Sequence, residues 1–156
     1  MSARTLQAII KPLKAQSRLK VAKAPFVSRA LKTFALRESV EAELETYLAE
    51  MRRNIPDLLP TKRWFDGAWV HGLEADLTDG TIRKGRPYAA YTRLEFALAV
   101  HPATDEVELT CRSTVFDRDL ETTRVRARAD APELMAFVEE ACCHFAERFW
   151  DRRRAA

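Results

Sequence analysis

With 156 residues, 47% of them hydrophobic and 31% charged, the chain is long enough for one domain with a sizeable core and too short for two. Its four glycines, seven prolines and short, charge-interrupted apolar stretches exclude fibrous repeats, low-complexity linkers and a membrane-spanning helix of about 20 residues. The net charge of +3 conceals an uneven distribution, because residues 1–37 hold nine of the 26 basic residues and none of the 23 acidic ones, which leaves the remainder at −6.

The N-terminal residues 1–37 are predicted to form a basic arm attached to a single α+β domain, residues 38–156. Apolar residues recur at helical spacing from Phe26 to Phe34, which predicts a short amphipathic helix within the arm. A cationic segment neutralises phosphates and releases counterions, so we expect the arm to engage a polyanion, with nucleic acid or a nucleoprotein assembly as the partner. The arm residues assigned to this contact are Lys11, Lys14, Arg18, Lys20, Lys23, Arg29 and Lys32.

A second helix is predicted from Ser39 to about Arg53. Ser39 is a suitable N-cap, acidic residues follow in the first turn, and two arginines occupy the last turn, in agreement with the helix dipole. The apolar stripe of this helix, which starts at Val40, has a different phase from the stripe of the first helix. This change of phase predicts a bend near residues 37–39.

From Trp64 onward the apolar period changes to two, which is typical of half-buried strands. A long amphipathic helix is predicted after Asp130, and the short connections before it favour an antiparallel meander with helices on one face. The predicted fold is α+β: a basic N-terminal arm and helices, a four-stranded antiparallel meander, and a long C-terminal helix packed on the sheet. The four predicted strands cover residues 68–77, 88–100, 107–115 and 120–129.

Basic clusters in the body extend the polyanion hypothesis. The loop containing Arg83, Lys84 and Arg86 is assigned to the same binding surface as the arm. A second cluster, the alternating arginines of the last strand, has two interpretations: it continues this surface, or it pairs across strands with Glu106, Glu108 or Glu95. The arginines in question are Arg124, Arg126 and Arg128.

Aromatic residues support a competing hypothesis, a protein-interaction adaptor that includes a homodimer as one form. Trp150 lies outside the main apolar face of the C-terminal helix, and the helix from Phe26 to Phe34 has the pattern of a docking element. The interface residues of this adaptor would be Phe26, Leu31, Phe34 and Trp150. A separate cluster, Trp64, Phe65 and Trp69, has two interpretations: it stacks on bases or on a small ligand, or it plugs the core.

No catalytic residue, metal site or cofactor is predicted. The three histidines lie on three different predicted elements without ligand-like spacing, and no glycine-rich phosphate loop is present. Cys111 falls on the apolar side of its strand, where a thiol is usually inert. We therefore expect a non-enzymatic protein; the third hypothesis is a ligand-binding cup lined by Trp69, Tyr91 or His71.

The number and spacing of the cysteines indicate the cellular compartment of the protein. Three cysteines, two of them adjacent, do not suggest a disulfide framework and indicate a reducing cytoplasm. A basic N-terminus without acidic residues is also typical of a mitochondrial presequence, so the predicted location is the mitochondrial matrix if the source is eukaryotic.

Overall fold

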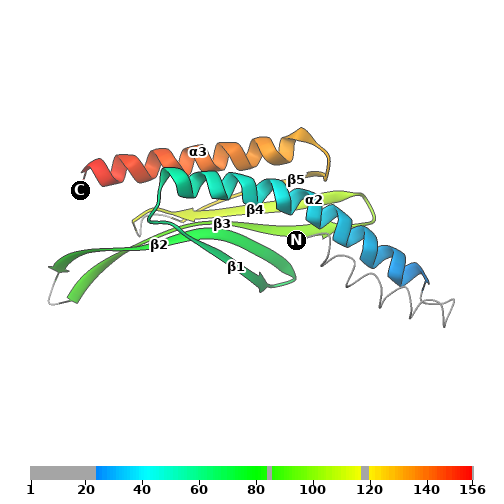
Figure 1. Ribbon diagram of the computed structural model, residues 1–156, viewed down its shortest axis with the longest axis horizontal. Coiled ribbons are helices and arrows are strands. Elements are labelled where there is room, and N and C mark those ends of the chain that lie inside the picture. The colour runs from blue at the N-terminus through cyan, green and yellow to red at the C-terminus, as the bar shows by residue number, and fades with distance from the viewer. Residues whose placement is uncertain (1–23, 84–85, 117–119, 156) are drawn as a thin grey trace.

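The computed structural model describes residues 24–83, 86–116 and 120–155 (Figure 1). Its elements in chain order are α2 (Ala24–Asn54), β1 (Leu59–Phe65), β2 (Ala68–Arg83), β3 (Arg86–His101), β4 (Glu106–Thr114), β5 (Glu121–Arg128) and α3 (Pro132–Ala155). The five strands form one antiparallel sheet in the order β1-β2-β3-β4-β5. Both helices cover the same face, here called the inner face, and no described helix covers the other, here called the open face (Figure 1). The α+β class, the meander and the C-terminal helix packed on the sheet are confirmed.

The prediction of four strands is wrong, because a fifth strand, β1, forms one edge of the sheet. Six of its seven residues are exposed, so it lacks the alternation of buried and exposed residues that identifies the other strands. Pro60 is tolerated there because an edge strand leaves backbone N–H groups unpaired. The turn into β2 consists of Asp66 and Gly67, which have φ angles of 51° and 76°. Positive φ at both positions is what a two-residue hairpin turn requires.

The prediction of two helices with a bend between them is also wrong, because α2 is one helix of 31 residues. Ser39 lies inside it, and its Oγ donates a hydrogen bond to the carbonyl of Leu36 at 3.0 Å instead of capping a helix. The apparent change of phase arises from two charged residues on the buried stripe. Once Arg37 and Glu41 are included, steps of three and four residues connect Phe34 to Leu44 without interruption.

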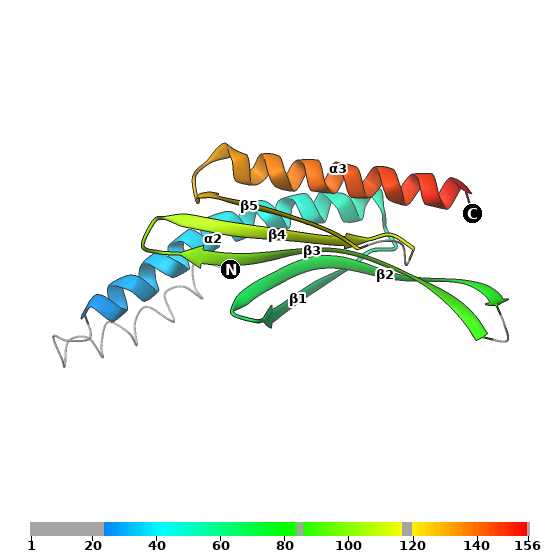
Figure 2. The ribbon, with the colours of Figure 1, turned by 180° about the vertical axis from the view of Figure 1, so that it is seen from behind.

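The core lies between the inner face and the two helices, which run side by side in the same direction (Figure 2). Helix α2 contributes Leu44 and α3 contributes Phe145 and Phe149, and all three side chains are fully buried. They pack against inward-facing strand residues such as Phe96 and Leu109. Burying a side chain of this size stabilises the fold by about 1.5–3 kcal/mol, so this layer accounts for the packing of both helices on the sheet.

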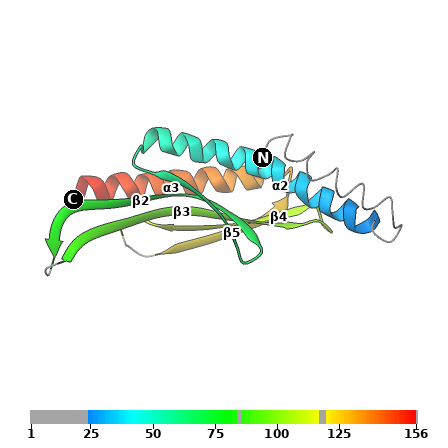
Figure 3. The same ribbon diagram turned by 60° about the horizontal axis from the view of Figure 1, so that its bottom comes forward.

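The β2–β3 hairpin extends beyond its neighbours. Pairing with β1 ends at Glu74 and pairing with β4 ends at Arg93, whereas β2 and β3 continue to pair with each other as far as Arg83 and Arg86, with a register shift between Thr78 and Ile82. The hairpin therefore ends in a two-stranded ribbon that projects from the sheet (Figures 1 and 3). Within the described part of the chain, neither helix is apolar enough over a sufficient length to cross a membrane.

Candidate functional site

A buried carboxylate connects α2 to the sheet. Glu41 is 0% exposed, and its two oxygens accept hydrogen bonds from Arg37 Nε at 2.8 Å and from Lys62 Nζ at 2.7 Å. Arg37 lies four residues earlier on α2, Lys62 comes from β1, and the Arg37 guanidinium lies 4.3 Å from the ring centre of Trp69. Burial by itself would raise the pKa of Glu41, but the hydrogen bonds from Lys62 and Arg37 outweigh it and hold that pKa below its ordinary value of 4.5.

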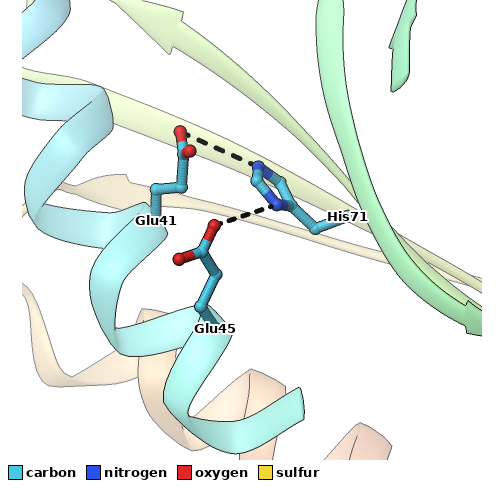
Figure 4. Close-up of side chains that lie close together, drawn as sticks. All are labelled: Glu41, Glu45 and His71. Atoms are coloured by element: carbon cyan, nitrogen blue, oxygen red, sulfur yellow. Dashed lines mark ion pairs between the residues drawn. The ribbon is translucent and has the colours of Figure 1, made fainter. Parts of the chain in front are cut away.

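His71 of β2 lies beside this pair (Figure 4). Its ring nitrogens lie 3.7 Å from Glu41 Oε2 and 3.7 Å from Glu45 Oε1, and both distances are too long for a hydrogen bond. The imidazole is buried, and Nε2 has no hydrogen-bond partner among the described residues. Burial lowers the pKa of His71 below its ordinary value of 6.5, although the neighbouring Glu41 opposes the shift. The ring is therefore uncharged at neutral pH.

The same side chains are the candidate for a metal site in the described part of the chain. Glu41, Glu45 and His71 offer three ligand atoms within 4.8 Å of one another. However, Arg37 and Lys62 already hold both oxygens of Glu41, so a metal ion would have to displace one of these cations. The two nitrogens of His71 also face different carboxylates, so one ion cannot use both contacts (Figure 4). The arrangement fits an ion network that joins α2 to β1 and β2 better than a metal centre.

The predicted polyanion-binding residues of the arm fall into two groups. Lys11, Lys14, Arg18, Lys20 and Lys23 lie outside the described residues. Arg29 and Lys32 lie on α2 and border a hollow of about 610 Å³ beside the β3–β4 turn. His101, which the sequence did not assign to this surface, also lines it, as does Arg126, for which a continuation of this surface was one of two interpretations; none of the lining residues is acidic. We refer to this feature, defined by Arg29, Lys32, His101 and Arg126, as the basic hollow.

Acidic residues next to the basic hollow balance part of its charge. Lys32 Nζ lies 2.7 Å from Asp105, and an Arg126 guanidinium nitrogen lies 3.2 Å from Glu106. Arg29 is exposed and forms no ion pair with any residue that the structure describes. Among the described residues, an incoming anion therefore meets one cation without an ion pair, Arg29, and two cations, Lys32 and Arg126, whose acidic partners are themselves at the surface.

The structure places the two remaining basic clusters, that of residues 83–86 and that of β5, in different surroundings. Arg83 and Arg86 are register partners at the end of the β2–β3 ribbon, while Lys84 and the side chains of the tip lie outside the described residues. All three arginines of β5 form ion pairs. Arg124 and Arg126 pair across strands with glutamates of β4, as one of the two interpretations predicts, whereas Arg128 pairs with an aspartate just after β5. The pairs are Arg124 with Glu108 at 3.6 Å, Arg126 with Glu106 at 3.2 Å, and Arg128 with Asp130 at 3.4 Å.

The aromatic cluster at the start of the sheet is only partly a core plug. Trp69 is half-buried, but Trp64 and Phe65 are 59% and 56% exposed. Trp64 meets Trp69 edge-on with ring centres 5.3 Å apart, and the Arg63 guanidinium lies 5.2 Å from the ring centre of Phe65. The core-plug interpretation is wrong for Trp64 and Phe65, because the end of the β1–β2 hairpin leaves both rings in contact with solvent.

The predicted partner-interface residues are separated in the structure. Leu31 and Phe34 are half-buried on α2, and the side chain of Phe26 lies outside the described residues. Trp150 is 39% exposed on α3, and its ring meets Phe149 edge-on at 5.3 Å. No observation tests whether these residues bind a partner, so the adaptor hypothesis stays a prediction.

The cysteines offer no activated thiol among the residues described. Cys111 and Cys142 are buried, and burial raises the pKa of each thiol to about 12. Cys143 is exposed, and all three are free. The position of Cys111 in the core agrees with the alternation of its strand.

Comparison with protein-family models, with curated proteins and with solved structures finds no match for this chain. Sequence reasoning also missed the ion network around Glu41. The available signal was local: Arg37 and Glu41 occupy positions i and i+4 on the line that joins Phe34 to Leu44, where charged side chains are buried only as a pair.

Proposed function

We propose that this protein is a small non-enzymatic module that binds a nucleic acid through its phosphates. The contacts come from residues 1–37, from the basic hollow and from the tip of the β2–β3 ribbon. The observation that carries the proposal is the basic hollow, in which the fold adds His101 and Arg126 to Arg29 and Lys32. Clustered cations are the main source of affinity for a phosphate backbone. Lys32 and Arg126 are here paired with the surface acids Asp105 and Glu106, which a phosphate would have to displace, whereas Arg29 has no ion pair with a described residue.

The position of the basic segments supports an extended ligand. The N-terminal end of α2 and the tip of the β2–β3 ribbon lie at opposite ends of the long axis, and the open face runs between them (Figures 1 and 3). Residues 38–156 are net negative, so a polyanion would be repelled elsewhere on the body and would be guided towards these regions. A nucleic acid strand is long enough to contact more than one of them at once.

Charge variants of the full chain test this proposal. One variant reverses three charges of the arm, Lys14→Glu, Lys20→Glu and Lys23→Glu, and a second neutralises the ribbon tip with Arg83→Gln, Lys84→Gln and Arg86→Gln. Binding of a labelled oligonucleotide is measured by fluorescence anisotropy at several salt concentrations. Both variants should bind more weakly than the wild type and with a flatter salt dependence. Each phosphate contact that is lost reduces the number of counterions released on binding.

The control is Arg53→Gln, which removes an exposed charge from the last turn of α2 and should leave binding unchanged. Substitutions are preferable to deletion of residues 1–37, since that deletion would cut α2 and remove Arg37 from Glu41. Unchanged affinity in both charge variants would overturn the proposal and redirect attention to a protein partner at Trp150.

A further inference from the structure

The open face has a floor of small side chains in its centre. Ala68, Val70 and Gly72 of β2 share this face with Ala97 of β3 and Thr110 of β4, as the strand register places them. Gly72 itself is buried, and a Cβ added there would lie 2.6 Å from the carbonyl oxygen of Leu94 and 3.0 Å from Thr61 Oγ1. No described helix covers the open face of the sheet (Figure 3). A planar group could therefore lie on Ala68, Ala97 and Thr110, which are partly exposed and line one hollow.

Larger side chains flank these small residues on the open face, and together they form a shallow hollow of about 130 Å³. Phe65 and Arg63 border it on the β1 side, and Arg112 and Arg124 border it on the side of β4 and β5. Ligand pockets that enclose a whole small molecule usually measure about 300–1,000 Å³. The volume here suits one flat group of a longer ligand.

Three arginines and two acidic residues, Asp66 and Glu95, line this open-face hollow, so its net charge is positive. Glu95 is buried, and arginine nitrogens of both Arg63 and Arg93 lie 3.3 Å from its Oε1, so its charge is balanced, although Arg93 also lies 3.8 Å from Glu74. Arg112 is exposed, although it lies opposite Glu95 in the register, and it makes no ion pair with a described residue. Arg124 is also exposed and lies 3.6 Å from Glu108. Arg112 and Arg124 are therefore accessible to a phosphate.

We infer that the open face binds an unpaired nucleotide of a single-stranded nucleic acid, with its base stacked on Phe65 and its phosphate paired with Arg112 and Arg124. This inference rests on the proposed function and specifies its substrate class. Exposed aromatic rings on a sheet, flanked by arginines, bind single strands because the face of every unpaired base is free to stack. In a duplex the neighbouring base pairs cover that face, so a paired base cannot use Phe65.

The two hollows are neighbours along β5. Arg124 borders the open-face hollow and Arg126 borders the basic hollow, and they lie two residues apart on the same side of β5. Two residues of a strand span about 7 Å. A single strand with a base on Phe65 can therefore place the following phosphates at Arg126 and Arg29.

The test compares a labelled single strand with the same strand annealed to its complement, using fluorescence anisotropy with the full chain. We expect the single strand to bind more tightly. Phe65→Ala should weaken single-strand binding about tenfold without changing duplex binding, and Phe65→Trp should retain it. The matched control is Trp64→Ala, which removes an equally exposed aromatic from the inner side of the same hairpin and should have no effect.

Arg112→Gln provides an independent measurement. It should lower the slope of log affinity against log salt by about 0.7 for the single strand, the value for one lost phosphate contact. A mononucleotide should compete only weakly, because it lacks the contacts at the basic hollow.

The outcomes separate this inference from the proposed function. Equal binding of single strand and duplex, with Phe65→Ala at wild-type affinity, would overturn the inference and leave phosphate binding intact. Binding of a mononucleotide as tightly as the strand would also overturn it. No binding of either nucleic acid by the wild type would overturn the proposed function itself.

Discussion

The carboxylate of Glu41 is buried, and it accepts hydrogen bonds from Arg37 and Lys62 in place of water. Transferring a charge into a protein interior costs several kcal/mol, which is recovered only if the partners are close and well oriented. Arg37 Nε and Lys62 Nζ approach to 2.8 Å and 2.7 Å, and Arg37 is itself buried beneath Trp69. The lowered pKa of Glu41 indicates that these attractions exceed the cost of burial. Each member of the network therefore depends on the others.

Glu41→Gln should destabilise the protein by about 3 kcal/mol, because it leaves Arg37 buried without a compensating charge. Urea unfolding followed by circular dichroism measures this change. The control is Glu45→Gln, since Glu45 is half-exposed and its loss should cost less than about 1 kcal/mol. Equal destabilisation by both substitutions would contradict the account of the network.

The lowered pKa of Glu41 predicts that the stability of the fold decreases in acid. Its pKa is lower in the folded state, so its stabilising contribution is complete above the ordinary value of 4.5 and is lost as the pH falls through the lower folded value. Glu41→Gln should remove this part of the acid sensitivity. A stability curve of the variant that falls as steeply as that of the wild type over this range would argue against it.

At the scale of the elements, α2 illustrates how a buried ion pair hides a helix in a sequence. A stripe is normally recognised by its apolar residues, so Arg37 and Glu41 divide one stripe into two fragments that seem out of phase. The structure restores the continuity, because the two charges neutralise each other inside the core. Residues on either side of Ser39 then belong to the same 31-residue helix.

Ser39→Pro distinguishes one helix from two. In the interior of α2 a proline removes a backbone hydrogen bond and clashes with the preceding turn, so we expect a loss of about 3 kcal/mol in urea unfolding. Ser39→Ala is the control and should have little effect, because alanine favours the helix. A helix that began at Ser39 would tolerate the proline, so near wild-type stability of Ser39→Pro would contradict the continuous helix.

How far each element could be predicted depends on which of its faces are buried. The strands β3 and β4 have one buried face, so residues such as Phe96 and Leu109 alternate with polar ones and identify them in the sequence. β1 is an exposed edge strand without this alternation and was missed, although the Asp66-Gly67 dipeptide is a sequence signal for a hairpin turn. The Arg37–Glu41 pair of the ion network had a local signal, but its contact with Lys62 and both hollows could not be predicted, because they join side chains that are distant in sequence, such as Arg29 and Arg126.

At the scale of the whole molecule, charge and surface shape divide between two faces. The inner face is covered by α2 and α3 (Figures 1 and 3). The open face carries arginines, the exposed Phe65 and several small residues. The uneven distribution of charge along the chain was evident from the sequence, but the position of the basic residues in the fold was not. Arg29 and Lys32 line the same hollow as Arg126 because the N-terminal part of α2 lies beside the β3–β4 turn. This arrangement leads to the central claim that the protein binds a nucleic acid through its phosphates.

The most direct test of that claim is the affinity of the wild-type chain for a labelled single strand, measured by fluorescence anisotropy over a series of potassium chloride concentrations. Contact with at least three phosphates predicts that log affinity falls against log salt with a slope of about −2 or steeper. Binding that is absent at low salt, or that does not change with salt, would contradict the account.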